Sequence, residues 1–218
     1  GIEFAVEKGL ISGRDELVDW IGTALSFGTG RSDGVLFRKA FEAVADEDWE
    51  RLGEVAELAV AFRPTSEIAT EQTGQGDAFL TTTRAIWPAP ALDHLTPAVA
   101  HSVAVAAACS AHGITLEDSL LAYLHTFAAN LVSAGVRLIP LGQTEGQAAL
   151  QALEPVVMAA RETALATSLD DLGTATPVMD WASMAHETQY TRLFRSCPPH
   201  PMAPSEWASA GRWARVRP

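Results

Sequence analysis

The fold is decided by one long segment, TLEDSLLAYLHTFAANLVSAGVRL, which runs from Thr115 to Leu138. Its large apolar residues recur at alternating spacings of four and three, the pattern of a helix that is buried along one face. Thr115 suits the start because its hydroxyl can accept a hydrogen bond from a free amide of the first turn. We therefore predict a long helix at the centre of the fold. Its expected buried stripe consists of Leu120, Leu124, Phe127, Leu131, Ala134 and Leu138.

The segments on both sides also predict helices rather than strands. Alanine and leucine occur in long runs, whereas β-branched and aromatic residues never gather into alternating segments bounded by turn residues. We therefore expect an all-α fold, a single-domain helical bundle of about eight to ten helices, over residues 1–196. The expected helices span about 14–27, 35–45, 48–62, 65–87, 97–113, 145–166 and 178–186, with the end of a further helix at 1–9 and a short element at 168–172.

Glycines mark the expected breaks and crossings of these helices. The run GTGRSDG at 28–34 is expected to be a connecting loop, with Ser32 or Asp33 capping the helix that follows. Gly74 and Gly76 lie inside an expected helix, where each glycine costs about 1 kcal/mol relative to alanine. We therefore expect a packing reason for these two glycines, either a close helix crossing or a kink.

Charge is distributed unevenly between the body of the chain and its end. The whole chain has a formal net charge of -12. Residues 1–190 contain ten Lys and Arg against 26 Asp and Glu, net -16, whereas residues 191–218 contain five Arg against one Glu, net +4. The acidic body argues against a nucleic-acid-binding protein, because neutralising phosphates needs a basic face. Residues 197–218 contain five prolines, four of them at 198, 199, 201 and 204, and are expected to form a flexible Pro/Arg-rich tail.

Cysteine usage and hydropathy indicate the compartment. The chain has only two cysteines, Cys109 and Cys197, so a disulfide framework is not expected and a reducing compartment, the cytoplasm, fits best. The most apolar run, 99–111, is interrupted by His101 and is too short to span a bilayer. We therefore expect no membrane role.

The familiar catalytic and cofactor-binding motifs are missing from the sequence. The glycine-rich runs at 28–34 and 142–147 lack the lysine of a phosphate-binding loop, and no GxSxG turn is present for a hydrolase triad. No pair of histidines has the close spacing of a zinc motif, and neighbouring carboxylates fall where solvated helix ends are expected. We therefore predict a protein that is not an enzyme and has no metal site or cofactor.

Two other classes stay open at this point. A helical enzyme or small-molecule-binding protein would need a pocket lined by histidine and cysteine, and Cys109 and His112 are one helical turn apart. The candidate residues for that pocket are His101, Cys109, His112 and His125. A helical DNA-binding regulator would need a basic recognition helix, which this acidic body does not offer.

A resemblance to a known family is carried by DWASMAHETQYTRLFRS, residues 180–196. The segment is similar to the C-terminal signature of the UreF family, in which Ser-Met-x-His-Glu is followed by Thr-Gln-Tyr and then by Arg-Leu-Phe-Arg-Ser. RLIPLGQTEGQAAL at 137–150 resembles the family's Pro-Leu-Gly-Gln-Thr turn, and TSEIATEQTGQGDAFL at 65–80 resembles its central region. Residues 1–3, Gly-Ile-Glu, match the end of its N-terminal motif. The sequence therefore resembles urease accessory proteins of the UreF type over nearly its whole length.

The resemblance implies an all-α homodimer that helps to insert nickel into apo-urease without catalysing a reaction. The implied partners are the accessory protein UreD/UreH, the GTPase UreG, which carries the nickel, and apo-urease. Arginine can bind carboxylates in a bidentate fork, and aromatic side chains are frequent binding hot spots, so we expect the C-terminal segment to dock on a partner. An arginine that stabilises charge on the phosphoryl group transferred by the GTPase is the alternative role. The expected partner-binding residues are Glu3, His186, Glu187, Gln189, Tyr190, Arg192, Phe194 and Arg195.

Overall fold

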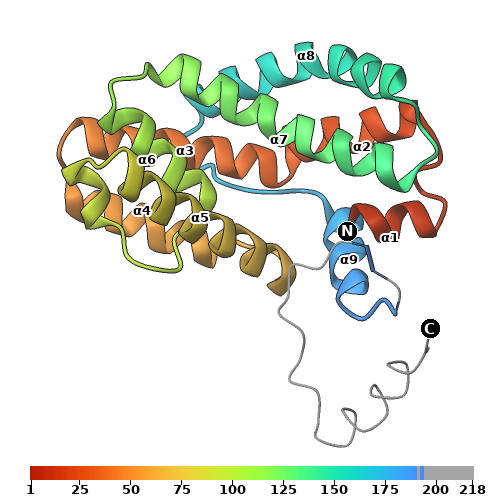
Figure 1. The fold of residues 1–218 in the computed structure, drawn as a ribbon, viewed down its shortest axis with the longest axis horizontal. Helices are drawn as coiled ribbons and strands as arrows, with labels where there is room; N and C mark the ends of the chain where they lie inside the picture. Colours follow the sequence, from red (N-terminus) through yellow and green to blue (C-terminus); the bar gives the residue numbers. More distant parts are fainter. Residues whose placement is uncertain (191, 194–218) are drawn as a thin grey trace, which may run out of the picture.

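Nine α-helices and one short 3₁₀ helix make up the part of the protein that the computed structural model describes, residues 1–190 and 192–193 (Figure 1). No strand occurs in these residues, so the predicted all-α fold is confirmed. The expected tail at 197–218 lies outside the described residues. In chain order the helices are α1 (Ile2–Glu7), α2 (Arg14–Phe27), α3 (Thr29–Ala45), α4 (Trp49–Ala61), α5 (Ser66–Ile86), η1 (Pro90–His94), α6 (His101–Ala111), α7 (Leu116–Leu138), α8 (Gln143–Ala166) and α9 (Pro177–Glu187).

Helix α3, not α7, occupies the centre of the bundle. It packs against α2, α4, α6, α7 and α8, while α7 lies along one side and buries one face (Figure 1). The helix predicted after Thr115 is confirmed, and the Thr115 hydroxyl accepts from the amide of Asp118. Its predicted central position is wrong. Helix α7 lies very close to α2 at Gly135, because a Cβ added there would lie 2.5 Å from a methyl carbon of Leu17. The buried face of α7 consists of Ser119, Leu120, Tyr123, Leu124, Ala128, Val132 and Gly135.

The glycine-rich run at 28–34 is the beginning of α3, so the predicted loop is wrong. The helix starts at Thr29, directly after the break at Gly28. Gly30 and Gly34 let the first turns of α3 lie close to neighbouring helices. A Cβ added at Gly30 would lie 2.9 Å from the Cα of Leu25 on α2, and one added at Gly34 would lie 2.9 Å from the Cβ of Ala164 on α8. Close packing, not chain reversal, explains these glycines.

A buried ion pair crosses the centre of the fold. Asp33, which was expected to be a helix cap, lies inside α3 with its side chain fully buried and accepts from the guanidinium of Arg63 at the α4–α5 corner. The Tyr123 hydroxyl on α7 donates to the other oxygen of the Asp33 carboxylate at 3.2 Å. Burial, together with the nearby Asp33 charge, raises the pKa of Tyr123 well above its usual range. The hydroxyl therefore stays protonated, and the three side chains join three parts of the bundle.

The crossing of α5 and α6 accounts for one of the two glycines in α5. A Cβ at Gly76 would lie 2.0 Å from the carbonyl oxygen of Val99 and 2.9 Å from the amide nitrogen of His101, so only glycine allows this contact. The predicted close crossing is therefore confirmed at Gly76. Gly74 has open space around its Cβ position and no packing reason.

These two glycines provide a matched test of the crossing. Gly76→Ala is expected to destabilise the protein by about 1–3 kcal/mol, because the added methyl meets backbone that cannot rotate away. Gly74→Ala is expected to stabilise it by up to about 1 kcal/mol through helix propensity alone. Denaturant-induced unfolding of both variants measures the difference, and equal effects would contradict the close crossing.

Several helix boundaries follow from local capping residues. Asp48 caps α4 by accepting from the amide of Arg51, and Thr65 caps α5 by accepting from the amide of Ile68. The helix expected from Pro97 instead begins at His101, after η1 and an irregular stretch with a bend at residues 97–98. Among the described residues, α7 is long and apolar enough to cross a membrane by length and composition alone, a test that core helices of soluble proteins also pass.

Candidate functional site at the junction of α1, α5 and α9

Helix α9 presents a polar face to the rest of the protein. Ser183, His186 and Glu187 are spaced three and four residues apart and therefore share one face of the helix. This face packs against α1 and the N-terminal turn of α5, at the end of the bundle opposite α4 and α6 (Figure 1). The signature motif thus supplies the side chains that attach α9.

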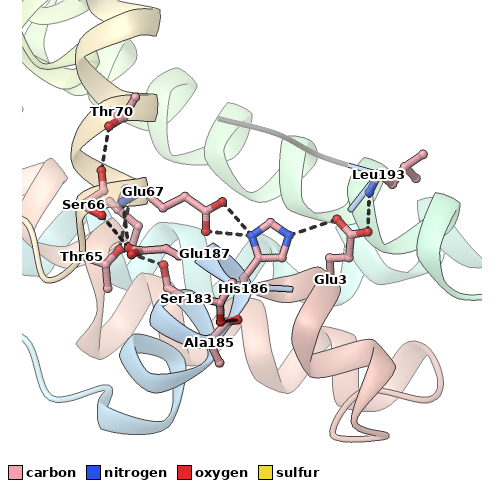
Figure 2. Close-up of polar contacts among 12 residues, drawn as sticks. Glu3, Thr65, Ser66, Glu67, Thr70, Ser183, Ala185, His186, Glu187 and Leu193 are labelled. Carbon is pink, nitrogen blue, oxygen red and sulfur yellow. Dashed lines mark hydrogen bonds and ion pairs between the residues drawn. The ribbon is translucent and has the colours of Figure 1, made fainter. Parts of the chain in front are cut away.

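His186 lies between two carboxylates (Figure 2). Its Nδ1 is 2.7 and 2.8 Å from the carboxylate oxygens of Glu67 on α5, and its Nε2 is 3.2 Å from a carboxylate oxygen of Glu3 on α1. The His186 residue is 3% exposed, and both glutamates are buried. Both ring nitrogens therefore lie within hydrogen-bonding distance of a carboxylate, and His186 bridges α5 and α1.

The end of α9 also completes the N-terminus of α5 (Figure 2). A carboxylate oxygen of Glu187 accepts from the Ser66 hydroxyl at 2.7 Å and from the Glu67 amide at 3.2 Å. The hydroxyls of Thr65 and Ser183 are 2.8 Å apart and hydrogen-bonded. The first amides of a helix have no partner within the helix, and a carboxylate there also meets the positive end of the helix dipole. Helix α9 therefore caps α5 from outside.

The residues after α9 turn back to α1. The Leu193 amide donates to the Glu3 carboxylate, and the Gln189 side-chain amide donates to Glu7 (Figure 2 shows the first of these). Glu3 consequently bridges α9 and the segment that follows it. These bonds make α1, α5 and α9 one hydrogen-bonded unit, which we call the α9 junction.

The opposite face of α9 exposes apolar side chains to solvent. Val178, Trp181 and Met184 are 55%, 50% and 51% exposed and lie three residues apart, so they form one row, which we call the α9 stripe. Trp181 is held from one side by Phe4, whose ring makes an edge-to-face contact at 5.2 Å. Tyr190, just beyond the helix, is 99% exposed. Large apolar side chains gathered at one end of a molecule are typical of an interaction surface.

The structure divides the expected partner-binding residues into different environments. Glu3 and His186 are buried in the α9 junction, whereas Tyr190 is 99% exposed. Glu187 and Gln189 are half-buried and hold α5 and α1, and Arg192 is half-buried. Phe194 and Arg195 lie outside the described residues. A role for any of these residues in partner binding stays a prediction.

Sequence reasoning missed five side chains of the junction, those of Glu7, Thr65, Ser66, Glu67 and Ser183. Thr65 and Glu67 have the local pattern of a helix start, a cap followed by an acid, and that pattern gives no hint of a second role. The spacing of Ser183 and His186 on one helix face was a usable signal. Nothing local identifies the partner of His186, because Glu67 is 119 residues away and Glu3 is 183.

The four residues of the alternative pocket are not brought together. The His101 ring packs against Phe79 and Tyr123 at 5.8 Å, and burial lowers its pKa, with the Asp33 charge acting in the opposite direction. His112 instead contacts the carbonyl of Trp87 at the end of α5, at 3.2 Å. His125 is exposed on α7, and burial raises the pKa of the Cys109 thiol. Within residues 1–190 and 192–193, no three His, Cys, Asp or Glu side chains are grouped to hold a metal ion.

Comparison with known proteins assigns the family. The family model for UreF matches residues 11–154, about two thirds of the chain. The chain belongs to the UreF family. It is 48% identical over 200 residues to the urease accessory protein UreF of Rhodopseudomonas palustris strain BisB5, and this alignment covers 90% of the chain and 82% of the relative. It is 49% identical over 199 residues to UreF of Bradyrhizobium sp. strain BTAi1, covering 90% and 83%. It is 46% identical over 200 residues to UreF of Granulibacter bethesdensis, covering 90% and 85%.

Membership of the UreF family confirms the resemblance found in the sequence and makes this chain a urease accessory protein. The matched segment 11–154 runs from just before α2 into α8. It includes Glu67 but neither Glu3 nor His186, so the α9 junction joins the matched body to both flanking segments.

Proposed function

We propose that this UreF-family protein is a non-enzymatic scaffold in nickel insertion into apo-urease. In this proposal it works as a homodimer in the cytoplasm, binds the accessory protein UreD/UreH at the α9 end and brings it together with the GTPase UreG and apo-urease. Family membership supports the accessory role. The alternative was an enzyme or small-molecule-binding protein with a pocket lined by histidine and cysteine. No observation in the described residues supports it, because these side chains do not converge and no metal site is grouped there.

The observation that carries the docking part of the proposal is the two-sided character of α9. Its polar side chains are engaged inside the protein, and its large apolar side chains face outward. An isolated surface helix normally shows the reverse arrangement. We therefore assign partner contact to the α9 stripe and Tyr190, and assign His186 and Glu187 the task of holding that surface in place.

Trp181→Ala is expected to weaken binding of UreD/UreH by roughly 30-fold or more, because truncating a tryptophan hot spot typically costs at least about 2 kcal/mol. Titration calorimetry with the purified UreD/UreH protein measures the change. Trp87→Ala is a matched control, because Trp87 is 61% exposed at the other end of α5. It is expected to leave this affinity unchanged, and an equal loss in both variants would contradict docking through α9.

A further inference from the structure

An open groove lies beside the α9 stripe, between α2 and the start of α9. Its volume is about 390 Å³, and its walls are mostly apolar. Trp20 and Leu10 contribute from the α2 side, and Val178 and Met179 contribute from α9. Val178 belongs to both the groove and the α9 stripe, so the two surfaces are continuous. A partner that covers the stripe therefore also reaches the groove.

The rim of the groove on α2 is acidic. Glu16 and Asp19 line it, are both exposed, and lie three residues apart on the face of α2 that also carries Trp20 and Thr23. The Arg14 side chain is already paired with Asp15 and Glu145. The rim thus has a net negative charge within an acidic body.

An apolar floor with an acidic rim defines the chemistry of the occupant. A large aromatic or aliphatic side chain gains most from the floor, because burying such a side chain supplies much of the energy of an interface. Lysine or arginine next to that side chain would pair with the rim, and charge complementarity selects the partner and speeds association. A nucleic acid or another acidic surface would be repelled.

We propose that the groove receives a large apolar side chain, flanked by lysine or arginine, from the same UreD/UreH protein that covers the α9 stripe. This inference rests on the proposed function and extends its docking surface from α9 onto α2. It adds Glu16, Asp19 and Trp20 as residues that determine which partner binds. In this proposal the groove buries the partner's large apolar side chain, and the carboxylates of the rim orient it by pairing with the neighbouring lysine or arginine.

The test reverses the charge of the rim in the full-length chain. Glu16→Lys combined with Asp19→Lys is expected to weaken UreD/UreH binding by at least about 10-fold and to reduce the dependence of the association rate on salt. The control combines Glu54→Lys with Glu57→Lys, because these two exposed glutamates on α4 have the same spacing and give the same change in net charge. Surface plasmon resonance at low and high salt compares the two variants.

A second variant tests the floor without changing the charge. Thr23→Trp places a bulky ring in the groove from an exposed position on α2, so the core is not disturbed. It is expected to weaken binding by at least about 10-fold at both salt concentrations, because the anchor side chain is excluded. Circular dichroism melts of all variants check that the bundle remains folded.

Each outcome decides between specific alternatives. If Trp181→Ala weakens binding but the groove variants do not, the groove proposal is wrong while docking through α9 stands. Equal losses in the rim pair and the α4 pair would show that general acidity, not the groove, attracts the partner. A changed molecular mass of the rim variant in light scattering would assign the groove to a second copy. Tighter UreD/UreH binding by a chain ending at residue 196 would assign the groove to residues 197–218 and overturn the proposal.

Discussion

His186→Ala is expected to release α9 from the protein while the rest of the bundle stays folded. The substitution leaves the carboxylates of Glu3 and Glu67 buried without the imidazole that lies between them. Leaving buried charged groups without their partner costs about 3–5 kcal/mol. The apolar attachment of α9 is small, since Ala182 is its only fully buried apolar residue among those described. The free energy lost in this variant is therefore expected to exceed the free energy with which the remaining contacts attach α9.

Hydrogen exchange measures this release directly. Amides of α9 and α1 are expected to lose protection in His186→Ala, while amides of α3 keep theirs. UreD/UreH binding should fall in the same variant, because the α9 stripe is then no longer held in place. His125→Ala, which removes an exposed histidine from α7, is the control and should change neither quantity. Unchanged protection of α9 in His186→Ala would show that the cluster does not hold the helix.

A neutral replacement separates charge from packing. Glu3→Gln and Glu67→Gln introduced together with His186→Gln remove both carboxylates and the imidazole and keep polar side chains. Replacing a whole buried ion cluster is generally less costly than breaking it. The triple variant is therefore expected to keep α9 more strongly protected than His186→Ala does.

The sequence predicted those parts of the structure that depend on neighbours along the chain. The bounds of α2 agree with the helix expected at 14–27, and the starts of α4 and α7 follow from Asp48 and Thr115. The beginning of α3 was missed for a physical reason. Three glycines in seven residues normally favour a loop, but here two of them let α3 lie so close to α2 and α8 that an added Cβ would come within 2.9 Å of their atoms. Tertiary packing overrides the local preference.

The candidate site depends on contacts that no local pattern encodes. The motif around His186 lies on the helix that carries the candidate site, and the helical period placed Ser183 and Glu187 on the same face. It could not show that this face is buried, because Ser, His and Glu are usually exposed residues. The buried partners come from α1 and α5. The polar side of α9 therefore holds the helix in place, and the apolar side faces solvent.

Arg63→Met is expected to lower the free energy of unfolding by about 3–5 kcal/mol. The Arg63 side chain is 1% exposed and the Asp33 side chain is fully buried, so removing the guanidinium leaves a buried carboxylate with only Tyr123 as a donor. Asp33→Leu is expected to cost a similar amount by leaving the arginine unpaired. Tyr123→Phe should cost less, about 1.5–3 kcal/mol, because it removes one hydrogen bond to a charged group.

The double variant Asp33→Leu with Arg63→Met decides whether the pair acts as a unit. Two apolar side chains of similar size leave no uncompensated charge, so the double variant is expected to be more stable than either single variant. Denaturant unfolding of the four proteins gives the coupling energy, and simple additivity would contradict the ion pair. The consequence extends to the α9 junction. Arg63 lies two residues before Thr65, whose hydroxyl is hydrogen-bonded to that of Ser183 on α9. Arg63→Met and Asp33→Leu should therefore also increase hydrogen exchange in α9. The buried pair at the centre of the bundle thereby fixes the corner on which α9, and the surface it presents, depends.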